Sequence, residues 1–370
     1  MTFYSEIKKY NWKEVSEQIY SKTEADVKLA LSKVKPDLND FQALLSPAAE
    51  KYLGLMLQKS MQITQKRFGK TIQLYIPLYL SNACNNTCVY CGFNHKNDFQ
   101  RTILTKEEVL KEAKAIKEQG FEHILLVTGE DSKQCGVEYI KDMMDALRKD
   151  FALVSIEVQP LKVDEYQSLI ESGLNTVYIY QETYNENNYR VYHPAGKKSD
   201  YQHRIETPDR LGQAGVHKIG LGCLLGLEDW RVDSFYTALH LSYLEKKYWQ
   251  SKYSISFPRL RPHAGSFQSK YRAGQKNLVQ LISAYRLFNE HVELSLSTRE
   301  DSKFRDNMLK LGVTAFSAGS KTNPGGYSSE EETLEQFSVH DNREPYEIAS
   351  MVKAKGYEVV WKDWDYFMQE

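Results

Sequence analysis

The sequence predicts an α/β fold, a (β/α)8 TIM-type barrel with an N-terminal helical extension. From about residue 71, short apolar runs alternate with amphipathic stretches of helical period, which is typical of βαβ units around a parallel sheet. Eight such runs spread over about 245 residues, the usual size of an eight-stranded barrel. Before them the patterns are helical, for example over residues 51–66. A partial barrel of six strands remains an alternative.

One helix and the strand after it illustrate how the elements are predicted. Thr105 and Glu108 have the spacing of a capping box, in which each side chain satisfies a free backbone N–H group at a helix start. Apolar residues then recur at helical spacing from Val109, and Gly120 ends the helix. The apolar run 124–127 follows, as expected for a strand buried on both faces. By the same reasoning we expect strands at 72–80, 123–128, 152–158, 174–180, 216–222, 252–257, 292–297 and 312–316, and helices at 136–149, 162–171, 200–214, 230–247, 274–289 and 302–310.

The expected domain organisation has three parts. Residues 1–68 form the helical extension, residues 69–320 the barrel, and residues 321–370 a C-terminal segment packed on the barrel. No low-complexity segment or long flexible linker separates them. In a barrel of this kind, chemistry takes place at the C-terminal ends of the strands. The loops that follow the predicted strands are therefore where functional residues are expected.

Composition and charge indicate a soluble cytoplasmic enzyme. The chain is 41% hydrophobic and 26% charged, with a net charge of −1 and a mean hydropathy of −0.56. This balance offers no electrostatic footprint for nucleic acid, and no apolar run is long enough to span a membrane. The first residues mix acids and bases and lack the apolar region of a signal peptide. Five cysteines, an odd number, argue against a disulfide framework and for a reducing compartment.

Three cysteines lie within eight residues, immediately after the first predicted strand. Cys84, Cys88 and Cys91 have the spacing C-x3-C-x2-C. Iron–sulfur clusters are normally held by four cysteines, so three leave one iron free to bind a small molecule. A structural zinc site that recruits His95 is an alternative, because Cys88, Cys91 and His95 also have zinc-ligand spacing. A chance grouping is the third interpretation.

Polar residues follow several predicted strands, where a buried core would not need them. Glu130 ends a Thr-Gly-Glu turn after the second strand, and its carboxylate can accept hydrogen bonds from an ammonium group. Glu182 follows the fourth strand and suits ribose hydroxyls, while Arg204 in the next helix suits a carboxylate. Glu157 ends the third strand, and Asp229 closes the glycine-containing run 220–229. A solvated turn at Glu130 and an internal ion pair between Glu182 and Arg204 are the structural alternatives.

The later strands end in cationic residues. Arg259 and Arg261 follow the sixth strand, Arg299 follows the seventh, and Ser317 lies at the end of the eighth. Such a cluster suggests an anionic substrate, for example the carboxylate of an amino acid, although each arginine is as readily part of a structural salt bridge. Arg299 is the preferred anchor, with Ser317 as a neighbouring hydrogen-bond donor and Arg259 and Arg261 as alternatives. The sequence contains no HExxH motif, P-loop or nucleophile elbow.

The cysteine run resembles that of the radical S-adenosylmethionine (SAM) enzymes. In that superfamily the three cysteines hold a [4Fe–4S] cluster whose open iron binds SAM. The resemblance implies that Tyr90 contacts the adenine, Glu130 the amino group of SAM, Glu182 its ribose and Arg204 its carboxylate. It further implies that the run ending at Asp229 lies beside the adenine and that Glu157 faces the cofactor. Thr128 departs from the family pattern, which has glycine at that position.

Within the superfamily, the chain resembles the 2-iminoacetate synthases, the tyrosine lyases of thiamine biosynthesis. The similarity covers most of the chain, and the C-terminal stretches 334–341 and 359–364 are the most specific. A related tyrosine lyase of hydrogenase maturation carries a second cluster in a C-terminal domain. No cysteine follows Cys223 here, so that role is disfavoured. The other segments that carry the resemblance are 76–82, 126–130, 180–184, 196–200, 206–210 and 256–262.

The resemblance implies a reaction and its participants. A 5′-deoxyadenosyl radical made from SAM would remove hydrogen from the amino group of L-tyrosine. Cleavage of the Cα–Cβ bond would then give 2-iminoacetate (dehydroglycine) and p-cresol, with 2-iminoacetate supplying the glycine-derived unit of the thiamine thiazole. An electron donor such as flavodoxin or ferredoxin and thiazole synthase are the implied partners. Another radical SAM amino-acid lyase, or a zinc-bound interaction module, is the alternative.

Overall fold

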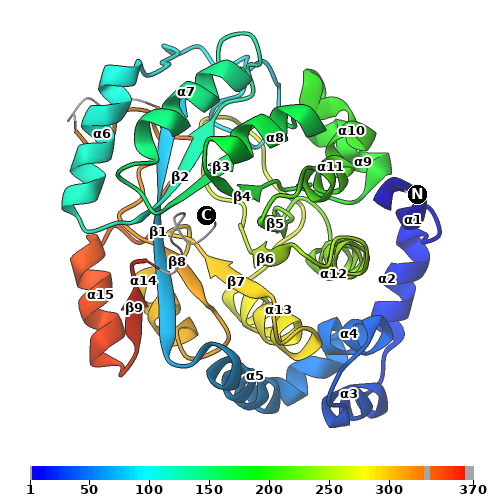
Figure 1. Cartoon of the computed structure of the whole chain (residues 1–370). Coiled ribbons are helices and arrows are strands. Elements are labelled where there is room, and N and C mark those ends of the chain that lie inside the picture. The colour runs from blue at the N-terminus through cyan, green and yellow to red at the C-terminus, as the bar shows by residue number, and fades with distance from the viewer. Residues whose placement is uncertain (1, 329–333, 363–370) are drawn as a thin grey trace.

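Eight parallel strands close into a barrel in the computed structural model, which describes residues 2–328 and 334–362 (Figure 1). Strands β2 to β8 follow one another in chain order, and β1 pairs with both β8 and β2, which closes the ring. The predicted barrel is confirmed, and the six-stranded alternative is wrong. The strands are β1 (Thr71–Ser81), β2 (His123–Thr128), β3 (Leu153–Glu157), β4 (Leu174–Tyr178), β5 (Lys218–Gly222), β6 (Lys252–Ser256), β7 (Glu293–Leu296) and β8 (Ala315–Ser317).

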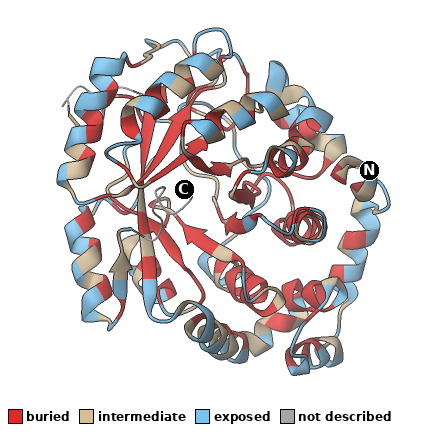
Figure 2. Cartoon of the chain, viewed as in Figure 1, coloured by how far each residue is buried: buried red, intermediate tan, exposed pale blue. Residues whose placement is uncertain are grey.

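Helices surround the barrel and turn their apolar faces toward the strands. Figure 2 shows buried residues along the strands and on the inner sides of the helices. The predicted capping box is present, because the backbone N–H of Glu108 donates to Thr105 Oγ1 over 3.3 Å and that of Thr105 donates to Glu108 Oε2 over 2.7 Å. The helices are α6 (Lys106–Glu118), α7 (Val137–Leu147), α8 (Val163–Glu171), α9 (Glu186–Tyr192), α10 (Tyr201–Ile205), α11 (Thr207–Ala214), α12 (Trp230–Lys247), α13 (Gln275–Phe288) and α14 (Ser302–Met308).

The single helix predicted over 200–214 is divided in two. It breaks at Glu206, and Pro208 lies in the first turn of α11. Proline is tolerated there because the first N–H groups of a helix have no intrahelical partner. The break leaves Arg204 on the short helix α10, whose start is capped by Asp200. The division therefore sets the position of a candidate cofactor residue.

The N-terminal residues form an arc of helices outside α12 and α13 (Figure 1). Backbone carbonyls at the end of α4 are satisfied by barrel helices: Gln280 Nε2 donates to Leu44 O over 2.9 Å, and Arg231 Nε donates to Leu45 O over 2.8 Å. These bonds fix the arc against the barrel wall. The elements are α1 (Phe3–Ile7), α2 (Trp12–Ser21), α3 (Glu24–Ser32), α4 (Leu38–Leu45), the 3-10 turn η1 (Pro47–Tyr52) and α5 (Leu53–Phe68).

The C-terminal segment contacts the open end of the barrel before it returns to the outside. The backbone N–H of Gly92 donates to Gln336 O over 3.1 Å, and that of His340 donates to Thr298 O over 2.9 Å. Helix α15 (Pro345–Ala354) and strand β9 (Glu358–Val360) follow, and β9 pairs in parallel with the first residues of β1. Asp363 and Trp364 of the family-specific stretch 359–364 lie outside the described residues. Within the described residues, no helix is long and apolar enough to cross a membrane.

Candidate active site

The three loop cysteines line a cavity at the open end of the barrel. Cys84, Cys88 and Cys91 are free thiols in the loop after β1, and all three face the same cavity. His95 does not join them, since its ring Nδ1 lies 3.1 Å from the backbone oxygen of Cys84 and its side chain is exposed. Among residues 2–328 and 334–362, no three His, Cys, Asp or Glu side chains are placed to hold a single metal ion. The arrangement does not favour a zinc site.

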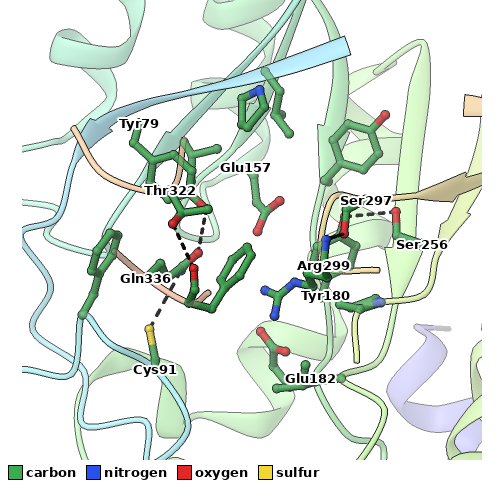
Figure 3. Close-up of a pocket in the computed structure, with 18 of the residues that line it drawn as sticks. Tyr79, Cys91, Glu157, Tyr180, Glu182, Ser256, Ser297, Arg299, Thr322 and Gln336 are labelled. Carbon is green, nitrogen blue, oxygen red and sulfur yellow. Dashed lines mark hydrogen bonds between the residues drawn. The ribbon is translucent and has the colours of Figure 1, made fainter. Parts of the chain in front are cut away.

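The same loop suits an iron–sulfur cluster. A [4Fe–4S] cluster takes each thiolate on a different iron, so its protein ligands are spread out rather than gathered around one point. Burial raises the pKa of all three thiols, that of Cys91 to about 11. Because a cluster binds cysteines as thiolates, its binding would release these protons. Two side-chain amides lie near the sulfurs. Asn86 Nδ2 lies 3.7 Å from Cys84 Sγ. Gln336 Nε2 lies 3.9 Å from Cys91 Sγ, a contact drawn in Figure 3. Such N–H donors stabilise cluster sulfurs and tune the cluster's potential.

Two glycines keep the cysteine loop in position. A Cβ on Gly129 would lie 2.1 Å from the carbonyl oxygen of Ala83, and a Cβ on Gly92 would lie 2.6 Å from that of Glu335. Both approaches are to backbone, which cannot swing aside as a flexible side chain can. The glycine of the Thr-Gly-Glu turn is therefore required for the loop after β2 to pack under Cys84, whatever binds in the cavity.

A compact group of charges lies beside the cysteines. Arg204 Nη1 donates to Glu130 Oε1 over 2.8 Å, and Lys198 Nζ donates to Glu182 Oε1 over 2.7 Å. Burial favours the neutral form of Glu130, but Arg204 and Lys198 outweigh it and the pKa of this carboxyl is lowered. Glu182 Oε1 lies 3.9 Å from Arg204 Nη2, so the two pairs form one network. The internal ion pair expected as an alternative is thus present, at the wall of the cavity.

Glu182 has a backbone conformation that non-glycine residues rarely adopt. Its φ is +67°, and among the described residues it is the only one other than glycine with a positive φ. Its carbonyl accepts the N–H of Leu224 over 2.8 Å, which ties it to the loop after β5. Backbone strain of this kind costs about 1–3 kcal/mol and is concentrated at functional sites. This backbone conformation places the Glu182 carboxylate within reach of Lys198 and Arg204.

Tyr90 forms an apolar wall between the cysteines and the loop after β5. Its ring packs with Tyr192, Leu224 and Leu227, and its hydroxyl lies 2.7 Å from His193 Nε2. Because the hydroxyl is already bonded, the ring is held in one orientation. The wall is flat and apolar, as a purine ring requires.

Arg299 occupies another part of the cavity (Figure 3). Its guanidinium lies 3.3 Å from the centre of the Phe337 ring, and its Nη1 donates a long bond of 3.4 Å to the carbonyl oxygen of Arg259. No ion pair to Arg299 is present among the described residues. Ser317 lines the same region, where its Oγ accepts the N–H of Thr298 over 3.1 Å. Burial lowers the pKa of Arg299 from its ordinary value, because the cation has few compensating contacts.

The other two candidate arginines are already paired. Arg259 donates through Nε to Glu300 Oε1 over 2.7 Å and through Nη1 to the carbonyl oxygen of Ala273 over 3.0 Å, and it does not line the cavity. Arg261 lines the cavity, but its Nη2 lies 3.3 Å from Glu300 Oε2. Both arginines therefore take part in internal salt bridges, which was the structural alternative to substrate binding.

Glu157 and Asp229 lie in different surroundings. Glu157 faces the cavity from the end of β3 (Figure 3). Asp229 does not line the cavity. It caps the start of α12, where its Oδ1 accepts the N–H of Arg231 over 2.9 Å and its Oδ2 accepts the hydroxyl of Tyr20 over 2.7 Å. The structure thus brings Glu157 together with the cysteines and the charge network and leaves Asp229 on the outer wall.

Three cavity residues were missed in the sequence. Lys198 is the cation nearest Glu182, and Gln336 and Phe337 contact Cys91 and Arg299 respectively. The signal was present, because all three fall in the segments 196–200 and 334–341 that carry the family resemblance. Strand-end reasoning could not find them, since none follows a barrel strand directly. Tyr75, Tyr79, Tyr178 and Tyr180, which line the inner wall, were likewise not singled out.

Comparison with known proteins decides the family. Residues 78–239 match the model of the Radical SAM superfamily, and residues 256–358 match that of the Biotin and Thiamin Synthesis associated domain. The chain is 48% identical over 368 residues to the 2-iminoacetate synthase of Escherichia coli K12, which covers 99% of this chain and 98% of the relative. The chain belongs to the 2-iminoacetate synthase family. The Salmonella typhimurium LT2 enzyme of the same name is 47% identical over 98% of this chain and 97% of its own length.

Solved structures agree on the fold. HydG, described as a maturase of the [FeFe]-hydrogenase, superposes with a TM-score of 0.86 at 31% identity, over 97% of this chain and 78% of its own. Methylornithine synthase (PylB) superposes with a TM-score of 0.73 at 19% identity, over 90% of this chain and 97% of its own. The radical SAM barrel is therefore the architecture of this 2-iminoacetate synthase family member, and its cofactors are a [4Fe–4S] cluster and SAM.

Proposed function

We propose that this protein cleaves the Cα–Cβ bond of L-tyrosine to give 2-iminoacetate and p-cresol, as a radical SAM lyase. The proposal rests first on the 48% identity, over 99% of the chain, to a 2-iminoacetate synthase. It rests further on the cavity, which is lined both by three free cysteines and by an arginine that has no acidic partner among the described residues. In thiamine biosynthesis, 2-iminoacetate supplies the glycine-derived unit of the thiazole.

The cofactors would bind at the cysteine end of the cavity. Cys84, Cys88 and Cys91 would hold the cluster, which with bound SAM would supply the 5′-deoxyadenosyl radical. Tyr90 supports the adenine through its flat apolar wall. Glu130 accepts from the SAM ammonium group, and Arg204 retains donors beyond those that reach Glu130 and the carbonyl of Tyr180, which it can present to the SAM carboxylate.

The substrate carboxylate is anchored on Arg299. A carboxylate taken out of water needs a charge-assisted partner, or its desolvation cost would prevent binding. Arg299 faces the cavity and lacks such a partner among the described residues, whereas Arg259 and Arg261 share Glu300. Ser317, on the adjacent strand end, supplies a neighbouring hydroxyl. The barrel then excludes water, which would otherwise hydrolyse the imine and quench radicals.

Two partners complete the proposal. An electron donor of the flavodoxin or ferredoxin kind reduces the cluster, and thiazole synthase receives 2-iminoacetate. The test of the function is direct: protein reconstituted anaerobically with iron and sulfide is supplied with SAM, a chemical reductant and L-tyrosine. p-Cresol and glyoxylate, the hydrolysis product of 2-iminoacetate, are expected in equal amounts. Production of 5′-deoxyadenosine without p-cresol would exclude tyrosine as the substrate.

A further inference from the structure

Two ionisable groups of opposite sign in the cavity have no oppositely charged partner among the described residues. The charged side chains that line the cavity are Glu130, Glu157, Glu182, Lys198, Arg204, Arg261 and Arg299. Five of these belong to ion pairs, namely Arg204 with Glu130, Lys198 with Glu182, and Arg261 with Glu300 outside the cavity. Among the residues that the structure describes, Arg299 and Glu157 have no ion pair, and the Glu157 carboxyl group has no hydrogen bond either. A buried charge without a partner is costly, so in a functional cavity such groups indicate what the ligand supplies.

Glu157 stands between the charge network and Arg299. The β-ladder places it level with Val127 of β2, which in turn is level with Tyr79 of β1, so it lies at the inner wall just below the cysteine loop. Figure 3 shows its carboxyl group directed into the cavity between Tyr79 and Arg299. The other titratable and charged groups that interact with it are Glu182, Lys198 and Arg204 from the network, Arg299 across the cavity, and the phenols of Tyr75, Tyr79, Tyr178 and Tyr180.

These surroundings keep Glu157 able to change its protonation state near neutral pH. Burial and the negative charge of Glu182 raise its pKa, Arg299, Lys198 and Arg204 lower it, and the result is a pKa of about 7. A carboxyl group with this pKa is a far stronger base than an ordinary glutamate. The pKa of Glu130 in the same cavity is lowered instead, because Arg204 and Lys198 outweigh burial and hold this carboxyl group in its charged form.

The proposed reaction needs a base at this place. An amino acid arrives as a zwitterion, with a protonated α-ammonium group, whereas hydrogen is to be abstracted from a neutral amine. If the substrate carboxylate binds Arg299 and the radical comes from the SAM side, the amino group must lie between them, where Glu157 projects. The transfer balances without an oxidant or reductant: the ammonium group loses one proton, Glu157 gains it, and both become neutral.

We propose that Glu157 is the catalytic base that removes a proton from the α-ammonium group of the substrate and then holds the amine by a hydrogen bond. The assignment rests on the proposed tyrosine lyase function. It places Glu157 in the substrate site rather than among the SAM-binding residues. Glu157 and Arg299 together then form an amino-acid site whose two ends match the two charges of the ligand.

The test compares Glu157→Gln and Glu157→Asp with Glu245→Gln. Glu245 is a matched control, because burial also raises the pKa of its carboxyl but it lies on α12, outside the cavity. Iron content, SAM affinity and SAM cleavage without tyrosine are measured first. p-Cresol formation in the first turnover is then measured from pH 6 to pH 9, so that re-reduction of the cluster does not limit the rate.

For the wild type and Glu245→Gln, we expect the first-turnover rate at low tyrosine concentration to rise with pH through about 7, because only the carboxylate form of Glu157 accepts the proton. Glu157→Gln should lose about 10²- to 10⁴-fold in rate at pH 7, the usual contribution of a general base. Its remaining rate should keep rising up to pH 9, because the α-ammonium group of a free amino acid, beside an ionised carboxylate, has a pKa above the value of about 8 for a peptide α-amino group. Glu157→Asp should retain part of the wild-type rate of p-cresol formation, and this rate should still increase with pH near 7.

Three results would overturn the proposal. The first is a Glu157→Gln variant with a wild-type rate, and the second is a slow variant whose pH profile is unchanged. The third is loss of SAM affinity or of tyrosine-independent SAM cleavage, which would return Glu157 to the cofactor site. These outcomes differ from failure of the proposed function, in which the wild-type protein itself makes no p-cresol.

Discussion

Replacing Arg204 by lysine tests how much the second nitrogen of the guanidinium group contributes to the affinity for SAM. Arg204 is 5% exposed, with Nε bound to the carbonyl oxygen of Tyr180 over 2.7 Å and Nη1 bound to Glu130 over 2.8 Å. A lysine at this position keeps the positive charge beside Glu130 but has no second nitrogen for the SAM carboxylate. Loss of one hydrogen bond to a charged group costs about 1.5–3 kcal/mol. The dissociation constant of SAM should therefore rise about 10- to 150-fold.

Isothermal titration of the reconstituted protein with SAM under anaerobic conditions measures this change. The control is Arg210→Lys, because Arg210 also donates to backbone carbonyls, those of Leu161 and His203, but does not line the cavity. Iron content should equal that of the wild type in both variants, since neither arginine contacts a cysteine sulfur. A SAM dissociation constant within threefold of the wild-type value in Arg204→Lys would refute the assignment of Arg204 to the carboxylate.

Further substitutions separate the other parts of the site. Serine in place of any one of the three loop cysteines should abolish SAM cleavage and the brown colour of the cluster, whereas Cys135→Ser should retain both, because Cys135 does not line the cavity. Arg299→Gln should raise the KM for tyrosine about 100-fold through the loss of charge-assisted bonds, while 5′-deoxyadenosine formation without tyrosine continues; an unchanged KM would rule out the anchor. In the metal-free protein, the free energy of unfolding of Glu182→Gly should exceed that of Glu182→Ala by about 1 kcal/mol, because alanine retains the strain at φ +67°. Denaturant titration measures this difference, and equal midpoints for the two variants would show that the strain is absent.

The barrel could be predicted because its signals are local. The capping box at Thr105 and the apolar run 124–127 each depend on neighbouring residues, and both appear in the structure as α6 and β2. The last barrel strand, β8 at Ala315–Ser317, starts three residues later than expected, since Gly312 has a φ of +126° and belongs to the preceding turn. Strand β9 was missed because its pairing partner is the start of β1, far away in the sequence.

The candidate site was only partly predictable, for a different reason. The spacing of the cysteines pointed to their shared site, but nothing local distinguishes Arg299 from Arg259, since both follow barrel strands. Only the fold shows that Glu300 pairs with Arg259 and leaves Arg299 facing the cavity. Lys198 is placed by an equally non-local contact: a Cβ on Gly196 would lie 2.2 Å from Asn86 Oδ1, so this glycine lets the segment pack directly against the cysteine loop.

The most direct test of the account is the stoichiometry of one turnover. Reconstituted protein with a reduced cluster, SAM and limiting L-tyrosine should give one 5′-deoxyadenosine and one p-cresol for each tyrosine consumed, and tyrosine should accelerate SAM cleavage. This coupling is expected because the cysteine loop and Arg299 line one and the same cavity. SAM cleavage at the same rate with and without tyrosine, and no p-cresol, would contradict the account.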